Sequence, residues 1–123
     1  MSKADALVLQ DYGFCSAIPV DSELAVVFIG GHNEAGIVVA SDSTVYRDTS
    51  LEDGEVKIYS KFGQSIKLGA DGSVLISGKS IKIESTEKID MESPIINISG
   101  MSIKIAGTGI TDIVSPAINF SRS

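Results

Sequence analysis

Residues 74–105 read VLISGKSIKIESTEKIDMESPIINISGMSIKI, and the spacing of their apolar side chains decides the fold of the C-terminal part. Pairs of large apolar residues, two positions apart, recur along this stretch and beyond it. The first members of successive pairs lie seven or eight residues apart. The pairs are Val74/Ile76, Ile81/Ile83, Ile89/Met91, Ile96/Ile98 and Ile103/Ile105, and the series continues with Ile110 and Ile118/Phe120.

A seven-residue period also occurs in coiled coils, but the intervals within this repeat exclude them. A heptad seam places apolar residues three and four apart, whereas here they lie two and five apart. Residues two apart are separated by about 200° on a helix and lie on the same side of a strand. Residues 74–123 also contain twelve Ile and one Leu, and β-branched residues favour strands. The pattern therefore predicts short strands joined by tight corners.

Each predicted strand has only two large apolar groups on one face, so the repeat needs further layers to bury them. A single-chain β-solenoid takes about 20 residues for one coil, whereas seven residues match one face of a prism wound from three chains. The step therefore favours a homotrimeric triple-stranded β-helix in which neighbouring strands come from different chains. The predicted trimer core comprises Val74, Ile76, Ile81, Ile83, Ile89, Met91, Ile96, Ile98, Ile103, Ile105 and Ile110, and Ile118 and Phe120 are predicted to close the tip.

The first 73 residues are predicted to form short strands joined by turns. The loop GGHNEAG at 30–36 predicts a hairpin, and Asp71-Gly72 predicts another. The stretch ELAVVFI at 23–29 is continuously apolar, so we expect it to be covered on both faces. The expected strands are 6–9, 23–29, 36–40, 55–59, 65–68 and 74–76.

Strand order and composition divide the chain into three parts. We predict an OB-like domain at 1–54, a β-meander neck at 55–73 and a trimeric shaft with its tip at 74–123. Because all the predicted elements are strands, the predicted fold class is all-β.

No apolar run approaches the roughly 20 residues of a membrane-spanning helix, and we expect no signal peptide.

Charge is unevenly distributed and bears on the class of partner. Residues 1–55 contain ten acidic and two basic side chains, a net charge of −8. Residues 56–123 contain eight bases and six acids, a net charge of +2. An acidic first half argues against a nucleic-acid-binding module, which usually has a basic stripe. The second half is typical of a solvated β surface.

Few residues are suited to catalysis, and we predict that the chain is not an enzyme. Cys15 has no His close in sequence, so it is predicted to be a small buried thiol rather than a nucleophile. His32 has no second ligand nearby and is expected to be an exposed loop residue, so no metal site is predicted. Asp90 and Glu92 flank the inward-pointing Met91 and are therefore expected to face solvent.

Asp112 interrupts the apolar series, because it stands where the partner of Ile110 is expected. Two alternatives stay open. Three inward copies would meet on the trimer axis, where they could hold a cation or stay protonated. A local bulge that turns Asp112 outward is favoured. Apart from such an axial ion, no cofactor is predicted.

Two stretches, residues 9–47 and 51–68, resemble a known family. They contain the elements YGF-x-S, VVF-x-GG-x-N, GIVVA-x-D and YR, then GEV-x-IY and G-x-x-I-x-L. These elements resemble the phage Mu-type baseplate assembly protein V family, the central tail spikes of contractile-tailed phages. The resemblance implies an OB-like domain followed by a trimeric β-helix, which punctures the host outer membrane when the sheath contracts. It also implies baseplate hub proteins as partners, a place in the virion tail baseplate, and assembly in the host cytoplasm.

Two features depart from the family pattern. Only three candidate strands precede residue 45, whereas an OB barrel has five, so the OB-like domain is expected to be partial. Many spikes of the family end in a His-x-His motif that binds iron, whereas here the sequence after residue 115 is PAINFSRS, so no apical iron site is predicted.

The alternative function is the shaft segment of a trimeric phage tail fibre or surface adhesin without a piercing role. An adhesin is expected to have an aromatic-rich or loop-rich binding head. The chain has seven aromatic residues, and only Phe120 follows Phe62. This distribution favours the spike.

Overall fold

The structure is a computed structural model that describes residues 7–31 and 35–122. Within those residues it contains six β-strands, one 3-10 turn and no α-helix, so the predicted all-β class is confirmed. No helix in this part of the chain is long and apolar enough to cross a membrane. Contacts divide the chain into two compact units, Met1–Ile83 and Glu84–Ser123. The predicted domain boundaries after residues 54 and 73 stay predictions.

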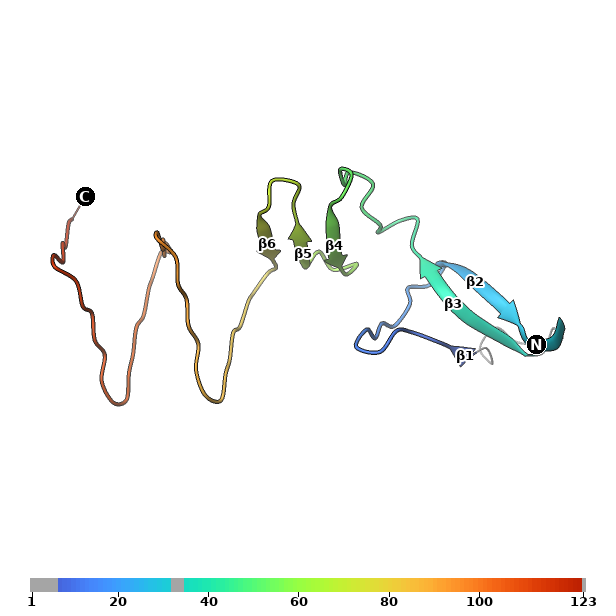
Figure 1. Ribbon diagram of the computed structural model, residues 1–123, viewed down its shortest axis with the longest axis horizontal. Helices are drawn as coiled ribbons and strands as arrows, with labels where there is room; N and C mark the ends of the chain where they lie inside the picture. The colour runs from blue at the N-terminus through green and yellow to red at the C-terminus, as the bar shows by residue number, and fades with distance from the viewer. Residues whose placement is uncertain (1–6, 32–34, 123) are drawn as a thin grey trace. The chain divides into compact units, whose positions relative to one another are not determined.

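The first sheet has the strand order β1-β3-β2 (Figure 1). Strand β2 (Glu23–Phe28) pairs antiparallel with β3 (Gly36–Asp42), as the loop between them predicts. The short strand β1 (Leu7–Val8) pairs parallel with β3 on its other side. The 3-10 turn η2 (Ile29–Gly31) follows β2 directly.

Very little of this sheet is buried within one chain. Val38, in the middle of β3, is 4% exposed and is the one buried large apolar residue in the described part of the chain. All six residues of β2 are exposed. The expectation that β2 is covered on both faces is therefore wrong for the single chain. The reason is that no second layer packs on the sheet within residues 7–31 and 35–122.

The second sheet is an antiparallel meander with the order β4-β5-β6. Its strands are β4 (Val56–Tyr59), β5 (Ser65–Leu68) and β6 (Val74–Ser77), which agree with the predicted strands within one residue at each end. Cross-strand pairing aligns Ile58 with Ile66, and Ile66 with Ile76. These three side chains are 42–57% exposed, so they form an apolar row without a cover.

Two hairpins of the same type join these strands. In the first, the Gly63 N–H donates to the Ser60 carbonyl at 3.2 Å, and Gly63 has φ 94°. In the second, the Gly72 N–H donates to the Gly69 carbonyl at 3.1 Å, and Gly72 has φ 83°. A type I turn followed by a left-handed residue closes three-residue hairpins, and glycine adopts that conformation at low cost. The prediction from Asp71-Gly72 is confirmed.

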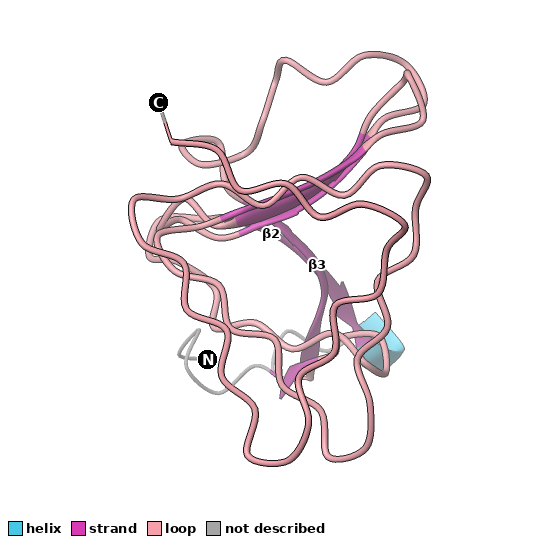
Figure 2. Cartoon of the chain, turned by 90° about the vertical axis from the view of Figure 1, so that its left-hand side faces the viewer, coloured by secondary structure: helices cyan, strands magenta, loops and turns pink. Residues whose placement is uncertain are grey.

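The second unit contains no strand among the described residues 84–122. Its corners are held locally by serine side chains. The Ser85 Oγ accepts the Lys88 N–H at 3.1 Å, and the Oγ atoms of Ser93 and Ser115 accept the N–H groups two residues onward, each at 3.3 Å. Figure 1 draws the segment towards the C-terminus as extended stretches separated by sharp bends, and Figure 2 colours it as loop.

Candidate functional site: an assembly surface

The paired apolar side chains of the repeat lie exposed in a regular pattern. In the four complete pairs after β6, the first residue is 51–57% exposed and the second is 64–72% exposed. This alternation recurs in every pair, so all four have the same local conformation. No strand ladder joins the pairs within residues 79–122 of the described chain. The four pairs are Ile81/Ile83, Ile89/Met91, Ile96/Ile98 and Ile103/Ile105.

The remaining predicted core and tip positions are also exposed. Val74 and Ile76 lie on β6 and are 62% and 56% exposed. Ile118 is 47% exposed, Phe120 92% and Ile110 84%, so Ile110 differs from the first members of the complete pairs. The assignment of these residues to a trimer core and a tip stays a prediction.

The surface of the whole chain is far too large for a compact monomer. The chain exposes 11830 Å². A folded monomer of 12.9 kDa exposes about 6300 Å² by the usual scaling of surface with mass. The excess, on the order of 5000 Å² per chain, is as large as the total area that the largest obligate interfaces bury from both partners together.

No group of three His, Cys, Asp or Glu side chains within the described residues is placed to bind a metal ion. His32 lies outside the described residues. Asp90 is 70% exposed and pairs with Lys88 at 3.0 Å, as expected for a solvated carboxylate.

Cys15 is exposed, so the prediction of a buried thiol is wrong for the single chain. The side chain of Gln10 closes the loop that contains Cys15 by hydrogen bonds to the backbone of Ser16. The Gln10 Oε1 accepts the Ser16 N–H at 2.8 Å, and the Gln10 Nε2 donates to the Ser16 carbonyl at 3.0 Å. This loop satisfies its own polar groups and leaves the thiol at the surface.

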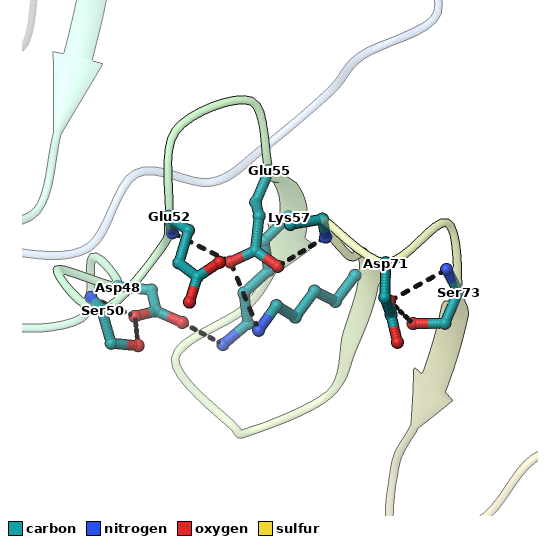
Figure 3. A network of polar contacts seen from close by, with 9 residues as sticks. Asp48, Ser50, Glu52, Glu55, Lys57, Asp71 and Ser73 are labelled. Atoms are coloured by element: carbon teal, nitrogen blue, oxygen red, sulfur yellow. Dashed lines mark hydrogen bonds and ion pairs between the residues drawn. The ribbon is translucent and has the colours of Figure 1, made fainter.

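Polar contacts that the sequence did not indicate link residues 48–57 to one another and to the β5–β6 hairpin (Figure 3). The Asp48 Oδ2 accepts a hydrogen bond from the Lys57 Nζ at 2.7 Å. The Asp48 Oδ1 accepts two more from the backbone N–H and the hydroxyl of Ser50, at 2.8 and 2.5 Å. Lys57 first, and then Ser50, lowers the pKa of the Asp48 carboxyl well below its usual range, because each stabilises the ionised form.

The Glu55 carboxylate joins two backbone segments, the turn before β4 and the β5–β6 hairpin. The Glu55 side chain is 7% exposed. The Oε1 atom accepts the Glu52 N–H and the Oε2 atom accepts the Ala70 N–H, both at 2.9 Å, and the Lys67 Nζ lies 3.7 Å away. The two N–H groups lower the pKa of Glu55, with Lys67 adding to the effect. The carboxylate therefore ties the turn before β4 to the β5–β6 hairpin.

These carboxylates are suited to a structural role. A general acid or base works best with a pKa near the operating pH, whereas the pKa of Asp48, Glu55 and Asp71 is lowered in each case. The one available sequence signal was the turn Glu52–Glu55, in which Gly54 has φ 87°. That turn places the Glu55 carboxylate where it accepts a hydrogen bond from the Glu52 N–H.

Comparison with known proteins relates the chain to a family of phage proteins. The family described as "Bacteriophage Mu Gp45, N-terminal" matches residues 1–44. The N-terminal segment belongs to the Mu Gp45 family. A curated relative, "Baseplate puncturing device gp45" of Escherichia phage Mu, is 31% identical over 86 residues. The matched region covers 70% of this chain and 44% of that relative.

The likeness to the Mu Gp45 family extends beyond the N-terminal segment, since 86 aligned residues exceed the 44 that the family description matches. The predicted resemblance to the Mu-type baseplate spikes is therefore confirmed. The chain spans less than half the length of the curated relative. No solved structure matches the chain.

Proposed function

We propose that the chain is a subunit of the central baseplate spike of a contractile phage tail, which punctures the outer membrane of the host. The observation that best supports this function is the exposed, evenly repeated set of Ile side chains in a chain that buries one large apolar residue among those described. The named activity of the phage Mu relative supports the same role. The spike is a virion protein of the tail baseplate, assembled in the host cytoplasm.

The shaft is a homotrimer in which three copies of residues 74–123 wind round one axis. Strands from two other chains lie between successive coils of one chain, which accounts for the missing ladder within residues 79–122. Seven strands stacked on each face at about 4.8 Å give a shaft of about 33 Å. The burial of inward Ile rows by all three chains removes the excess surface.

The mechanism is mechanical. A needle must transmit axial force without buckling or unfolding. In an interwound trimer every shaft strand is hydrogen-bonded to strands of other chains, so bending one strand has to break ladder bonds to both neighbours. No group in this mechanism needs to act as a catalyst, and no cofactor is proposed.

The first unit joins the shaft to the baseplate. Its β1-β3-β2 sheet forms the core of a partial OB-like domain, with baseplate hub proteins as partners. Strand β2 offers an exposed apolar face for such a partner or for the other chains of the trimer. The neck between the two parts is held by the carboxylates of Asp48 and Glu55.

Light scattering on the purified chain tests the assembly. A mass of three times 12.9 kDa is expected, and a monomer would refute the spike. Antibody labelling of phage particles then separates the spike from a tail fibre or adhesin. Label at the centre of the baseplate supports the spike, whereas label along peripheral fibres would refute it.

A further inference from the structure

The shaft segment contains a second, longer repeat of 22 residues. Residues 74–95, the first coil, and residues 96–117, the second coil, are identical at eleven of 22 positions. The backbone bends at residues 79, 86–87 and 94 recur at 101, 108–109 and 116. One contact of two glycines also recurs, because a Cβ on either Gly78 or Gly100 would lie 3.6 Å from the carbonyl oxygen two residues onward. The two coils therefore bend at equivalent positions.

The equivalence of the two coils indicates which side chains around Asp112 face inward and which face outward. In the 22-residue register Ile110 corresponds to Lys88, Asp112 to Asp90 and Ile113 to Met91. Ile113 is 66% exposed, like the second members of the pairs, whereas Ile110 is 84% exposed, unlike the first members at 51–57%. Thr111 and Ile113 therefore take the inward positions of this level, and Ile110 and Asp112 face outward.

The outer surfaces of the two coils differ sharply in charge. The first coil has seven ionisable side chains and the second has two, Lys104 and Asp112, which correspond to Lys82 and Asp90. Met101, Ile110 and Val114 are 109%, 84% and 93% exposed, and we call them the outer apolar set. The five replaced residues, Lys79, Glu84, Glu87, Lys88 and Glu92, correspond to Met101, Ala106, Gly109, Ile110 and Val114.

We propose that the outer apolar set contacts the hydrocarbon of an anionic phospholipid bilayer. This inference rests on the proposed function, because the three-chain shaft is what directs these side chains outward. Charge complementarity supports lipid as the occupant. The first coil has a net charge of −1 and the second is neutral, and Arg122, beyond the second coil, brings residues 96–123 to +1. The second coil keeps one carboxylate, Asp112, in place of the four of the first coil, so it repels anionic headgroups less.

The geometry of the set also favours lipid over a protein partner. Each chain contributes three large side chains, interspersed along the coil with Ser, Gly and Thr. A protein partner needs a packed, shape-matched interface with a buried core. Hydrocarbon needs only apolar area to contact, and moving charged side chains into it is costly. The loss of five charges from one coil to the next lowers the cost of contact with hydrocarbon.

The test restores the residues of the first coil in the second. The full chain with M101K, I110K and V114E receives at each position the residue that the equivalent position already has. Flotation with vesicles of phosphatidylethanolamine and phosphatidylglycerol is compared with that of the wild type. The variant should stay trimeric and bind at least about tenfold more weakly. A matched control, K79Q with K88Q and E92Q in the first coil, should leave flotation unchanged.

Each outcome is decisive. A trimeric variant that floats like the wild type overturns the lipid contact and leaves the spike intact. A variant that is monomeric while the wild type is trimeric overturns the outward assignment, and the single variant I110K then identifies whether Ile110 is the inward residue. A wild-type trimer that does not float overturns the lipid contact in favour of another occupant. A monomeric wild type refutes the proposed function itself.

Discussion

Replacing Ile103 by aspartate tests the shared core most directly. Ile103 is the first member of its pair and is 52% exposed in the single chain. In the proposed trimer its three copies meet at one level of the axis. Ile103→Asp therefore places three carboxylates next to one another in a space that otherwise holds only aliphatic side chains. We expect the variant to remain monomeric.

The magnitude follows from the burial that the trimer would add. Full burial of an Ile side chain stabilises by about 1.5–3 kcal/mol, and about half of that is still to be gained at Ile103. Three copies therefore lose about 2–4.5 kcal/mol of apolar burial. Moving each charged carboxylate out of water costs several kcal/mol more. The total exceeds about 10 kcal/mol per trimer, which corresponds to about seven orders of magnitude in the association constant.

Light scattering of the wild type and three variants measures this effect. Ile103→Val removes one methyl group per chain, at about 0.5–1.5 kcal/mol each, and should remain trimeric. Lys104→Asp introduces the same carboxylate on the outward side of the same strand, so it should also remain trimeric. If Ile103→Asp is a trimer that resists heat like the wild type, Ile103 does not point to a shared core.

The pH dependence of Ile103→Asp adds a second criterion. Burial raises the pKa of the introduced carboxyl in the assembled form. Assembly is therefore favoured at a pH below the ordinary value for aspartate, about 3.9, and is lost as the pH rises through the raised pKa. Partial recovery of the trimer below about pH 4, absent at pH 7, is the expected result. A variant monomeric at every pH that still folds would argue for steric rather than electrostatic disruption.

Three further predictions address the neck and the coils. Gly72→Ala should lower the free energy of unfolding by about 1–2 kcal/mol in a urea titration, because Gly72 has φ 83°, whereas Gly72→Asn should cost less. Lys57→Met should raise the pKa of Asp48 and make the neck less stable at neutral pH. In the wild type the contribution of Asp48 is present above the unfolded-state pKa and is lost as the pH falls toward the lowered one, so the difference between the two proteins in urea should shrink in acid. Deleting residues 78–99 removes one whole coil and joins Ser77 to Gly100 as in the original corner, so a shorter trimer is expected by light scattering. Deleting only 78–88 breaks the order of corners and should abolish assembly.

The strands of the first unit could be predicted from the sequence because their signals are local. Alternation of apolar and polar residues sets β4 and β5, and the Asp71-Gly72 turn fixes the β5–β6 hairpin by its backbone conformation alone. Contacts over longer distances could not be predicted in this way. The hydrogen bond from the Ala70 N–H to Glu55 joins residues fifteen apart, and no pattern of residue types marks that pair.

The site was only partly accessible for a related reason. The spacing of apolar residues identified the pairs of the repeat, but it does not give the positions of the backbone bends between them. Asp112 looked like a break in the series when only the distance from Ile110 was considered. The bend that recurs at residues 108–109, 22 residues after the bend at 86–87, shows that the register shifts there by one residue. Backbone geometry was needed to choose between the inward and outward alternatives.

Two different demands meet in the same strands, and the period of two separates them. In the proposed trimer, inward positions must fill a narrow interior shared by three chains, so β-branched or similarly sized apolar side chains are needed in both coils. Outward positions have no such constraint from assembly. They are charged in the first coil, at Lys88 and Glu92, and apolar in the second, at Ile110 and Val114. A change in what the shaft contacts can therefore be made at alternate residues without any change in the surface that assembles it.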